Sequence, residues 1–199
     1  MDTSPAPRSH AAPVLVPQRR LRVRRAMRFL DAQRVPELGF ASYVSADGDF
    51  HRRSVSPPEV FSEMLIAGAL ADGGIVSEGR ATMLRVVKRA FTTEGLVHFF
   101  HDKELLPADL DCTAVALALL VDHDICTNVD PHAVLDRMAG NTNRAGVVTV
   151  YVSDEARANR VDPAVCVNVL YAFYLLGRGA ELEETEAYVE SFIESEGWA

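Results

Sequence analysis

The strongest constraint on the fold is an alternation between two kinds of apolar segment with helical spacing. Segments of the first kind are apolar almost all round, which predicts helices buried on every side. They span residues 58–71, 109–121 and 163–176. Segments of the second kind carry one apolar stripe beside charged residues, which is typical of helices with one face in water. They begin at Arg19, Glu78, Pro131 and Glu181.

This alternation predicts an all-α protein with two layers, because an inner helix contacts both the outer layer and whatever fills the centre. We therefore expect an α/α toroid or a partial α/α barrel of alternating inner and outer helices. Three inner segments are too few to close such a ring. A homo-dimer, a missing C-terminal segment or an open groove would each account for the shortfall. The strand-like run at 146–152 predicts an extended loop or short hairpin between an outer and an inner helix.

Composition and charge set further limits. Several prolines among small residues predict that residues 1–17 are disordered, and residues 18–199 are expected to form a single α/α helical domain. The net charge of -8 argues against nucleic-acid binding, which needs a cationic surface. The arginines between 19 and 28 predict a cationic helix face that is either solvated or in contact with an anion.

The cysteines point to a reducing environment. Cys112, Cys126 and Cys166 lack the spacing of a zinc site and are too few to cross-link a chain of this length. We also find no signal-peptide pattern and no apolar run long enough to span a membrane. The sequence therefore predicts a cytoplasmic protein with free thiols.

A group of acidic and histidine residues at 122–124 contains metal-ligand types. Neighbouring residues on a helix do not face the same point, so we expect the exposed end of a helix there and no metal cluster.

The sequence Asp109-Leu110-Asp111-Cys112-Thr113-Ala114 opens the second inner segment. Asp109 can cap this helix, which places Asp111 in the first turn, where backbone N–H groups and the helix dipole stabilise a carboxylate. Burial among apolar helices acts in the opposite direction and raises the pKa of a carboxyl group. The pattern therefore fits either an ordinary helix cap or an acid that keeps its proton near neutral pH.

These six residues resemble the acid motif of the terpenoid cyclase and prenyltransferase superfamily, in particular of class II terpene cyclases. The Asp-x-Asp-Asp-Thr-Ala form of squalene-hopene and diterpene cyclases matches except at Cys112, and the Asp-Cys-Thr-Ala form of oxidosqualene cyclases matches fully from Asp111. The resemblance implies an α/α barrel in which Asp111 protonates an alkene or epoxide of a polyprenyl or terpenoid substrate and so starts carbocation cyclisation. It also implies that Asp109 and Cys112 tune this acid.

The same resemblance implies an apolar cavity lined by rings that stabilise positive charge. The candidate substrate-binding residues are Tyr171, Phe173, Tyr174, Cys166 and Asn168. The Asp-Asp-x-x-Asp motif of metal-dependent terpene synthases is absent, so we expect neither a metal nor another cofactor. The chain departs from the family in being only 8% aromatic and in lacking a second domain.

Two alternatives use the same helices without this chemistry. One is a noncatalytic α-helical solenoid that binds a partner protein or a lipid in its open groove. The other is a repeat scaffold unrelated to terpenoids, in which Asp109 and Asp111 are solvent-exposed caps.

Overall fold

The structure is a computed structural model that describes residues 17–35, 39–40, 43–45, 53–55, 57–125, 128–153 and 159–195. Its α-helices are α1 (Pro17–Gln33), α2 (Phe61–Asp72), α3 (Glu78–Ala90), α4 (Leu110–Asp122), α5 (Pro131–Ala139), α6 (Pro163–Leu175) and α7 (Glu183–Glu194), with a 3₁₀ turn, η1 (Gly179–Leu182), before α7. The predicted disorder at 1–17 and the thiol of Cys126 lie outside the described residues, apart from Pro17, which begins α1.

The strands are two or three residues long and form antiparallel pairs: β1 (Arg34–Val35) with β2 (Gly39–Phe40), β3 (Tyr43–Ser45) with β4 (Arg53–Val55), and β5 (Val97–His98) with β6 (Ala108–Asp109). The prediction of an all-α protein is thus confirmed. Among the described residues, no helix is long and apolar enough to cross a membrane.

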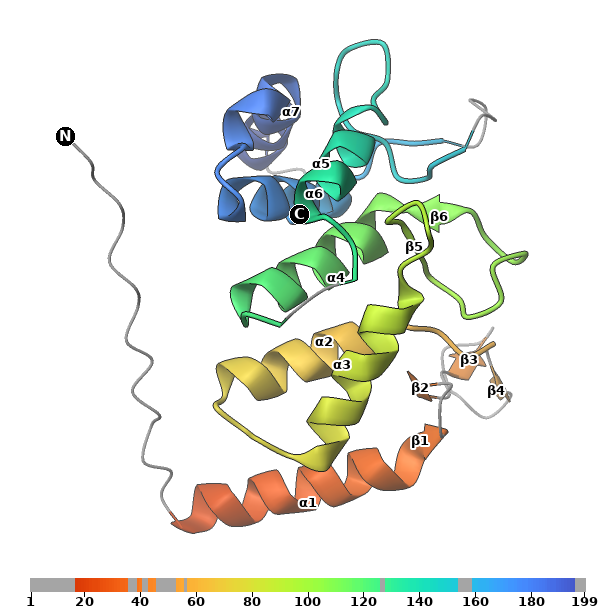
Figure 1. The fold of residues 1–199 in the computed structure, drawn as a ribbon, viewed down its shortest axis with the longest axis vertical. Coiled ribbons are helices and arrows are strands. Elements are labelled where there is room, and N and C mark those ends of the chain that lie inside the picture. Colours follow the sequence, from red (N-terminus) through yellow and green to blue (C-terminus); the bar gives the residue numbers. More distant parts are fainter. Residues whose placement is uncertain are drawn as a thin grey trace, which may run out of the picture.

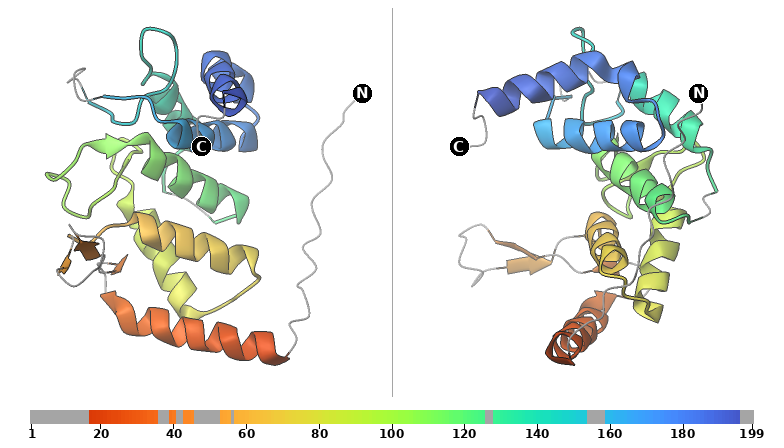
Figure 2. Two further views of the ribbon diagram at one scale, coloured as in Figure 1. Left: turned by 180° about the vertical axis from the view of Figure 1, so that it is seen from behind. Right: turned by 90° about the vertical axis from the view of Figure 1, so that its left-hand side faces the viewer.

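The helices form an open row with α1 at one end and α7 at the other (Figure 1). Helix α4 packs against α2 on one side and α6 on the other, while α3 covers α2 and α4. Helices α5 and α7 both pack on α6, as the two further views also show (Figure 2). Closure of this row into a toroid stays a prediction.

Aspartate caps fix where the central helices begin. Asp109, Asp130 and Asp162 cap α4, α5 and α6, and each accepts a hydrogen bond from a backbone N–H of its own first turn. A proline follows two of these caps, at the position where its missing N–H costs nothing. Helix α2 begins at Phe61, later than predicted, because Glu59 forms an isolated β-bridge with Phe100.

The burial of the inner helices is only partly as predicted. Helix α4 buries nine of its 13 residues. By contrast, α2 and α6 each leave an apolar face in solvent, with Leu65 53%, Val167 47% and Tyr171 52% exposed. The prediction of all-round burial is therefore wrong for α2 and α6, since no described helix covers these faces.

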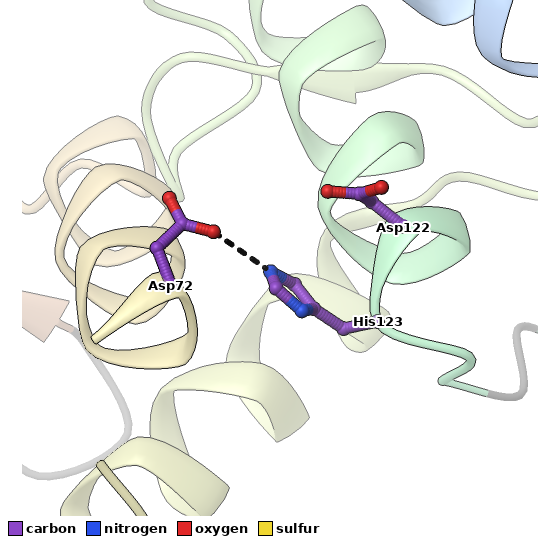
Figure 3. Close-up of side chains that lie close together, drawn as sticks. All are labelled: Asp72, Asp122 and His123. Carbon is purple, nitrogen blue, oxygen red and sulfur yellow. Dashed lines mark ion pairs between the residues drawn. The ribbon is translucent and has the colours of Figure 1, made fainter. Parts of the chain in front are cut away.

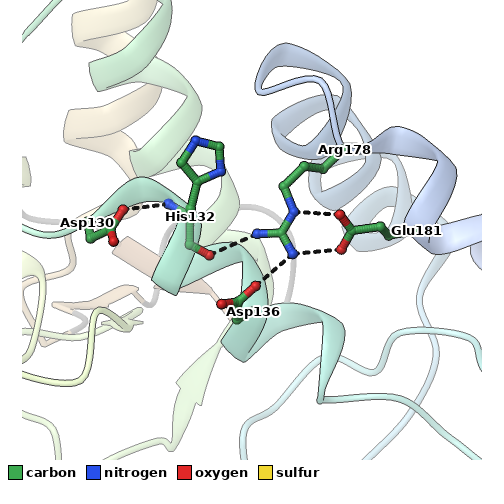
Figure 4. Close-up of polar contacts among 5 residues, drawn as sticks. All are labelled: Asp130, His132, Asp136, Arg178 and Glu181. Carbon is green, nitrogen blue, oxygen red and sulfur yellow. Dashed lines mark hydrogen bonds and ion pairs between the residues drawn. The ribbon is translucent and has the colours of Figure 1, made fainter.

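A charged network ties α5 to the end of α6 (Figure 4). The Arg178 guanidinium donates hydrogen bonds to both carboxylate oxygens of Glu181 at 2.6 Å and to Asp136 at 2.6 Å. It also donates to the main-chain carbonyl of His132 at 3.0 Å. Because its side chain is only 20% exposed, Arg178 holds an outer helix and the end of an inner helix in one arrangement.

The contact between Gly95 and α5 gives a test of this packing. Gly95 has a φ of +79°, and an added Cβ would lie 2.8 Å from a methyl group of Val134. Gly177 has a similar φ of +74° with nothing within 4 Å, so it is a matched control. We expect Gly95→Ala to lower the free energy of unfolding by about 1–3 kcal/mol more than Gly177→Ala, measured by chemical denaturation. Equal losses would contradict the packing of this turn against α5.

Candidate active site

The start of α4 is held by hydrogen bonds within the acid motif. The Oδ1 atom of Asp109 accepts from the Cys112 N–H at 2.7 Å. The Thr113 hydroxyl donates to the Asp109 carbonyl at 2.7 Å and accepts from the Val97 N–H at 2.9 Å. Thr113 therefore joins the motif to β5. The sequence analysis did not assign this role to Thr113, although its position four residues after the Asp109 cap allows a hydrogen bond to the Asp109 carbonyl.

The loop between α5 and α6 lies over this helix start. The Leu110 N–H donates to the Val150 carbonyl at 2.8 Å, and the Val152 N–H donates to the Ala108 carbonyl at 2.8 Å. The loop is itself held by Asn159, whose side chain bonds both the N–H and the carbonyl of Tyr151. The predicted extended loop between an outer and an inner helix is confirmed, and it forms one wall of the site.

Asp109 is the more deeply buried of the two motif carboxyl groups. It is 5% exposed, and its Oδ2 atom is buried without a hydrogen-bond partner. Burial raises the pKa of Asp109 from its ordinary value of 3.8 to about 6, although the hydrogen bonds from Cys112 oppose this increase. The cap is therefore also a carboxyl group that binds a proton at mildly acidic pH.

Asp111 is half-buried and is bonded to the next inner helix. Its Oδ1 atom accepts a hydrogen bond from Asn168 Nδ2 at 2.7 Å. Burial raises the pKa of Asp111, the Asn168 hydrogen bond lowers it, and the negative charge of Asp162 raises it again. The net direction is upward, which favours the protonated acid.

Asp109 and Asp111 line a pocket of about 250 Å³. Arg160 and Asp162 lie on the same wall, with their charged groups 3.7 Å apart. The remaining lining is apolar and includes Phe99, Leu106 and Val150. This pocket is small and mixed in polarity, so it differs from the wholly apolar chamber that the resemblance implied.

A larger and more apolar pocket of about 400 Å³ lies between α2, α4 and α6. Its apolar lining includes Met64, Leu65, Val115, Leu119 and Tyr171. Asn168 also lines it while donating to Asp111. The side chain of Asn168 therefore connects the acid to the apolar pocket.

The other predicted site residues lie apart from this pocket. Phe173 is fully buried in the core, and Tyr174 is 53% exposed with its hydroxyl donating to Glu186 at 2.7 Å. Cys112 and Cys166 are fully buried, and burial raises the pKa of both thiols, that of Cys166 to about 11. Of the five predicted substrate-binding residues, Asn168 and Tyr171 line the apolar pocket.

Residues 122–124 lie next to a third side chain of metal-ligand type that is distant in the sequence. Asp122 and His123 lie at an exposed helix end as predicted, but Asp72 from the end of α2 joins them (Figure 3). Donor atoms of the three side chains lie within 4.8 Å of one another, so they could hold a metal ion. Sequence reasoning missed Asp72 because it lies far from the other two along the chain.

Comparisons with known proteins are consistent with the motif. Residues 23–176 match the family described as sesquiterpene cyclase astC-like C-terminal domain. Over 90 residues the chain is 36% identical to drimenol cyclase drtB of Aspergillus calidoustus. This alignment covers 45% of the chain but only 16% of that relative. No solved structure matches the chain.

The raised pKa of Asp109 predicts a pH dependence of stability. The native state binds a proton more tightly than the unfolded state, so the free energy of unfolding falls as pH rises from about 4 to about 7, by about 3 kcal/mol. Asp109→Asn keeps a capping oxygen but cannot ionise. We expect the fall in the free energy of unfolding between pH 4 and 7 to be smaller by this amount in Asp109→Asn, as measured by chemical denaturation across that pH range. Parallel pH profiles of the two proteins would contradict a buried, protonated Asp109.

Proposed function

Because the chain belongs to the family of sesquiterpene cyclase astC-like C-terminal domains, we propose that it is a class II terpene cyclase-like protein. In this proposal Asp111 protonates an alkene or epoxide of an isoprenoid substrate. The observation that carries the proposal is the 2.7 Å hydrogen bond between Asp111 and Asn168, since Asn168 also lines the apolar pocket.

In this proposal the two oxygens of the Asp111 carboxyl group have different roles. Asn168 Nδ2 donates to Oδ1, which leaves Oδ2 to carry the proton. On transfer, the π electrons of the substrate form a new C–H bond, the carbon beyond becomes a carbocation and Asp111 becomes a carboxylate. Asp111 lies in the first turn of α4, so the helix N-terminus stabilises that carboxylate.

The neighbours of Asp111 fit this role. Asp109 has a pKa of about 6 and adds little negative charge while it is protonated, which limits repulsion of the carboxylate that forms. Cys112 is fully buried and supplies an apolar contact at the helix start. Tyr171 places an aromatic ring on the apolar pocket, where it can stabilise a carbocation.

The assignment of Asp111 predicts a specific loss of activity. We expect Asp111→Asn to lower cyclisation by about 10²–10⁴-fold, because Asn cannot donate the required proton. Product analysis by mass spectrometry after incubation with farnesyl diphosphate, geranylgeranyl diphosphate, squalene and oxidosqualene measures this loss. Asp130→Asn is the matched control, since Asp130 caps α5 on the surface and Asn keeps that cap. Full activity of Asp111→Asn would exclude Asp111 as the acid.

Asn168 gives a second prediction through the pH profile. Its hydrogen bond lowers the pKa of Asp111, so Asn168→Leu raises that pKa further. The reaction needs protonated Asp111, and activity therefore falls as pH rises through this pKa. We expect the falling limb of kcat/KM against pH to move to higher pH in Asn168→Leu. A lower rate with an unmoved limb would mean that Asn168 contacts substrate without tuning the acid.

A noncatalytic protein that binds a partner or a lipid is the second candidate function. The observation in its favour is the apolar face left in solvent by α2 and α6, with Leu65 and Val167 about half exposed. The incubations above separate the two candidates, because tight binding of an isoprenoid without any new product favours the noncatalytic one. A second copy of the chain or a further segment of the protein would then be the partner that completes the ring.

A further inference from the structure

The two ends of the helical row carry opposite charge. Helix α1 contains arginines at several positions from 19 to 28, and Asp31 is its only acidic residue. Helix α7 contains glutamates along its whole length and no basic residue. The two helices lie at opposite ends of the row in all three views (Figure 1 and Figure 2). One molecule therefore cannot place its own α1 on its own α7.

The outward face of α1 is cationic. Met27 and Leu30 turn inward and pack against the core. The exposed side chains on the other side, here called the arginine face, are Arg22, Arg24, Arg25, Arg28 and Phe29. Within the described residues, no ion pair neutralises these arginines. Arg24 and Arg28 are four residues apart, so they are neighbours on the helix and repel each other. A negatively charged partner would relieve this repulsion.

The outward face of α7 is anionic. Thr185 and Val189 are buried on its inner side. The exposed side chains on its outer side, here called the glutamate face, are Glu183, Glu184, Glu190, Glu194 and Ile193. Glu190 and Glu194 are four residues apart and repel each other. The last turn of α7 contains no basic residue, although a helix C-terminus favours positive charge. A positively charged partner would therefore stabilise this face.

The two faces are complementary in charge and similar in kind. Each combines exposed side chains of one sign with one large apolar side chain, Phe29 at 64% exposure on α1 and Ile193 at 51% on α7. Opposite charges on two surfaces steer their encounter and determine which surfaces meet. Two arginine faces repel each other, and so do two glutamate faces. The favourable contact is accordingly between unlike faces of different molecules.

We propose that the arginine face of α1 in one copy of this chain binds the glutamate face of α7 in a second copy. The contact is independent of the proposed function and does not use the apolar face of α2 and α6. It forms although the chain as a whole has a net charge of -8, because the positive charge is concentrated on one helix. Since both faces are exposed, salt screens the attraction between them and weakens the association.

The self-association is tested by sedimentation velocity on the full chain at increasing protein concentration. We expect the weight-average sedimentation coefficient to rise with concentration in about 0.1 M salt, where the Debye length is about 10 Å. In about 1 M salt, where this length is about 3 Å, the coefficient should stay at the monomer value. A chain that is monomeric in both buffers, or an association that salt does not weaken, overturns the proposal.

Charge reversal tests which faces meet. The α1 variant combines Arg24→Glu with Arg28→Glu, and the α7 variant combines Glu190→Arg with Glu194→Arg. We expect each variant alone to associate at least about tenfold more weakly than the unchanged chain in low salt, because its two faces then have the same sign. The far-ultraviolet circular dichroism spectrum of each should be unchanged, since the substituted side chains are exposed. Undiminished association of either variant overturns the proposal.

An equimolar mixture of the two variants separates lost charge complementarity from damage to the fold. The α1 variant has two acidic faces and the α7 variant has two basic faces, so each can bind the other but not itself. We expect the mixture to regain the association that each variant lacks alone. A mixture that stays monomeric in low salt overturns the pairing of these two faces.

Arg85→Glu combined with Arg89→Glu is the matched control. These two arginines are also exposed and four residues apart, but they lie on α3. We expect this control to associate like the unchanged chain, and a loss equal to that of the α1 variant overturns the assignment. An anionic membrane is the competing partner of the arginine face. Cosedimentation with phosphatidylserine vesicles that the α1 variant loses, in a chain without self-association, would assign the face to lipid and overturn the proposal.

Discussion

The capping of α4 by Asp109 is the interaction on which the rest of the site depends. One oxygen of Asp109 accepts from the Cys112 N–H, and the Asp109 carbonyl accepts from Thr113, whose hydroxyl in turn binds β5. Burial makes this cap a carboxyl group with a raised pKa. The same geometry fixes the first turn of α4 and therefore the direction in which Asp111 meets Asn168. Asp109 is therefore both the N-cap of α4 and, because it is buried, a carboxyl group with a raised pKa.

The packing of α2, α4 and α6 then decides what surrounds that acid. Helix α4 lies between the other two and contributes residues to two pockets, the small one of mixed polarity that contains Asp111 and the larger apolar one. Asn168 of α6 links the two, because it donates a hydrogen bond to Asp111 in the small pocket and also lines the apolar one. The small pocket thus lies at the first turn of α4 and the apolar pocket beside its later turns, and Asn168 joins the two.

Helix types and starts could be predicted from local pattern, since apolar periodicity and Asp-Pro caps act within a few residues. The start of α5 at Pro131 and the cap at Asp109 are examples. The exposure of Tyr171 could not be predicted in this way. It depends on whether another helix covers α6, and the pattern of apolar residues within α6 carries no information about that. The hydrogen bond from Asn168 to Asp111 spans 57 positions, and the approach of Asp72 to His123 depends on how α2 and α4 cross. Such contacts follow from tertiary packing and have no local signature.

Under the proposed function, the uncovered face of the apolar pocket affects the fate of a carbocation formed in that pocket. Leu65 and Tyr171 each line the pocket and remain about half exposed, so water reaches a ligand from that side. A carbocation within reach of water is captured as an alcohol instead of losing a proton to give an alkene. The degree of hydroxylation among any products would thus report how completely this face is shielded during turnover.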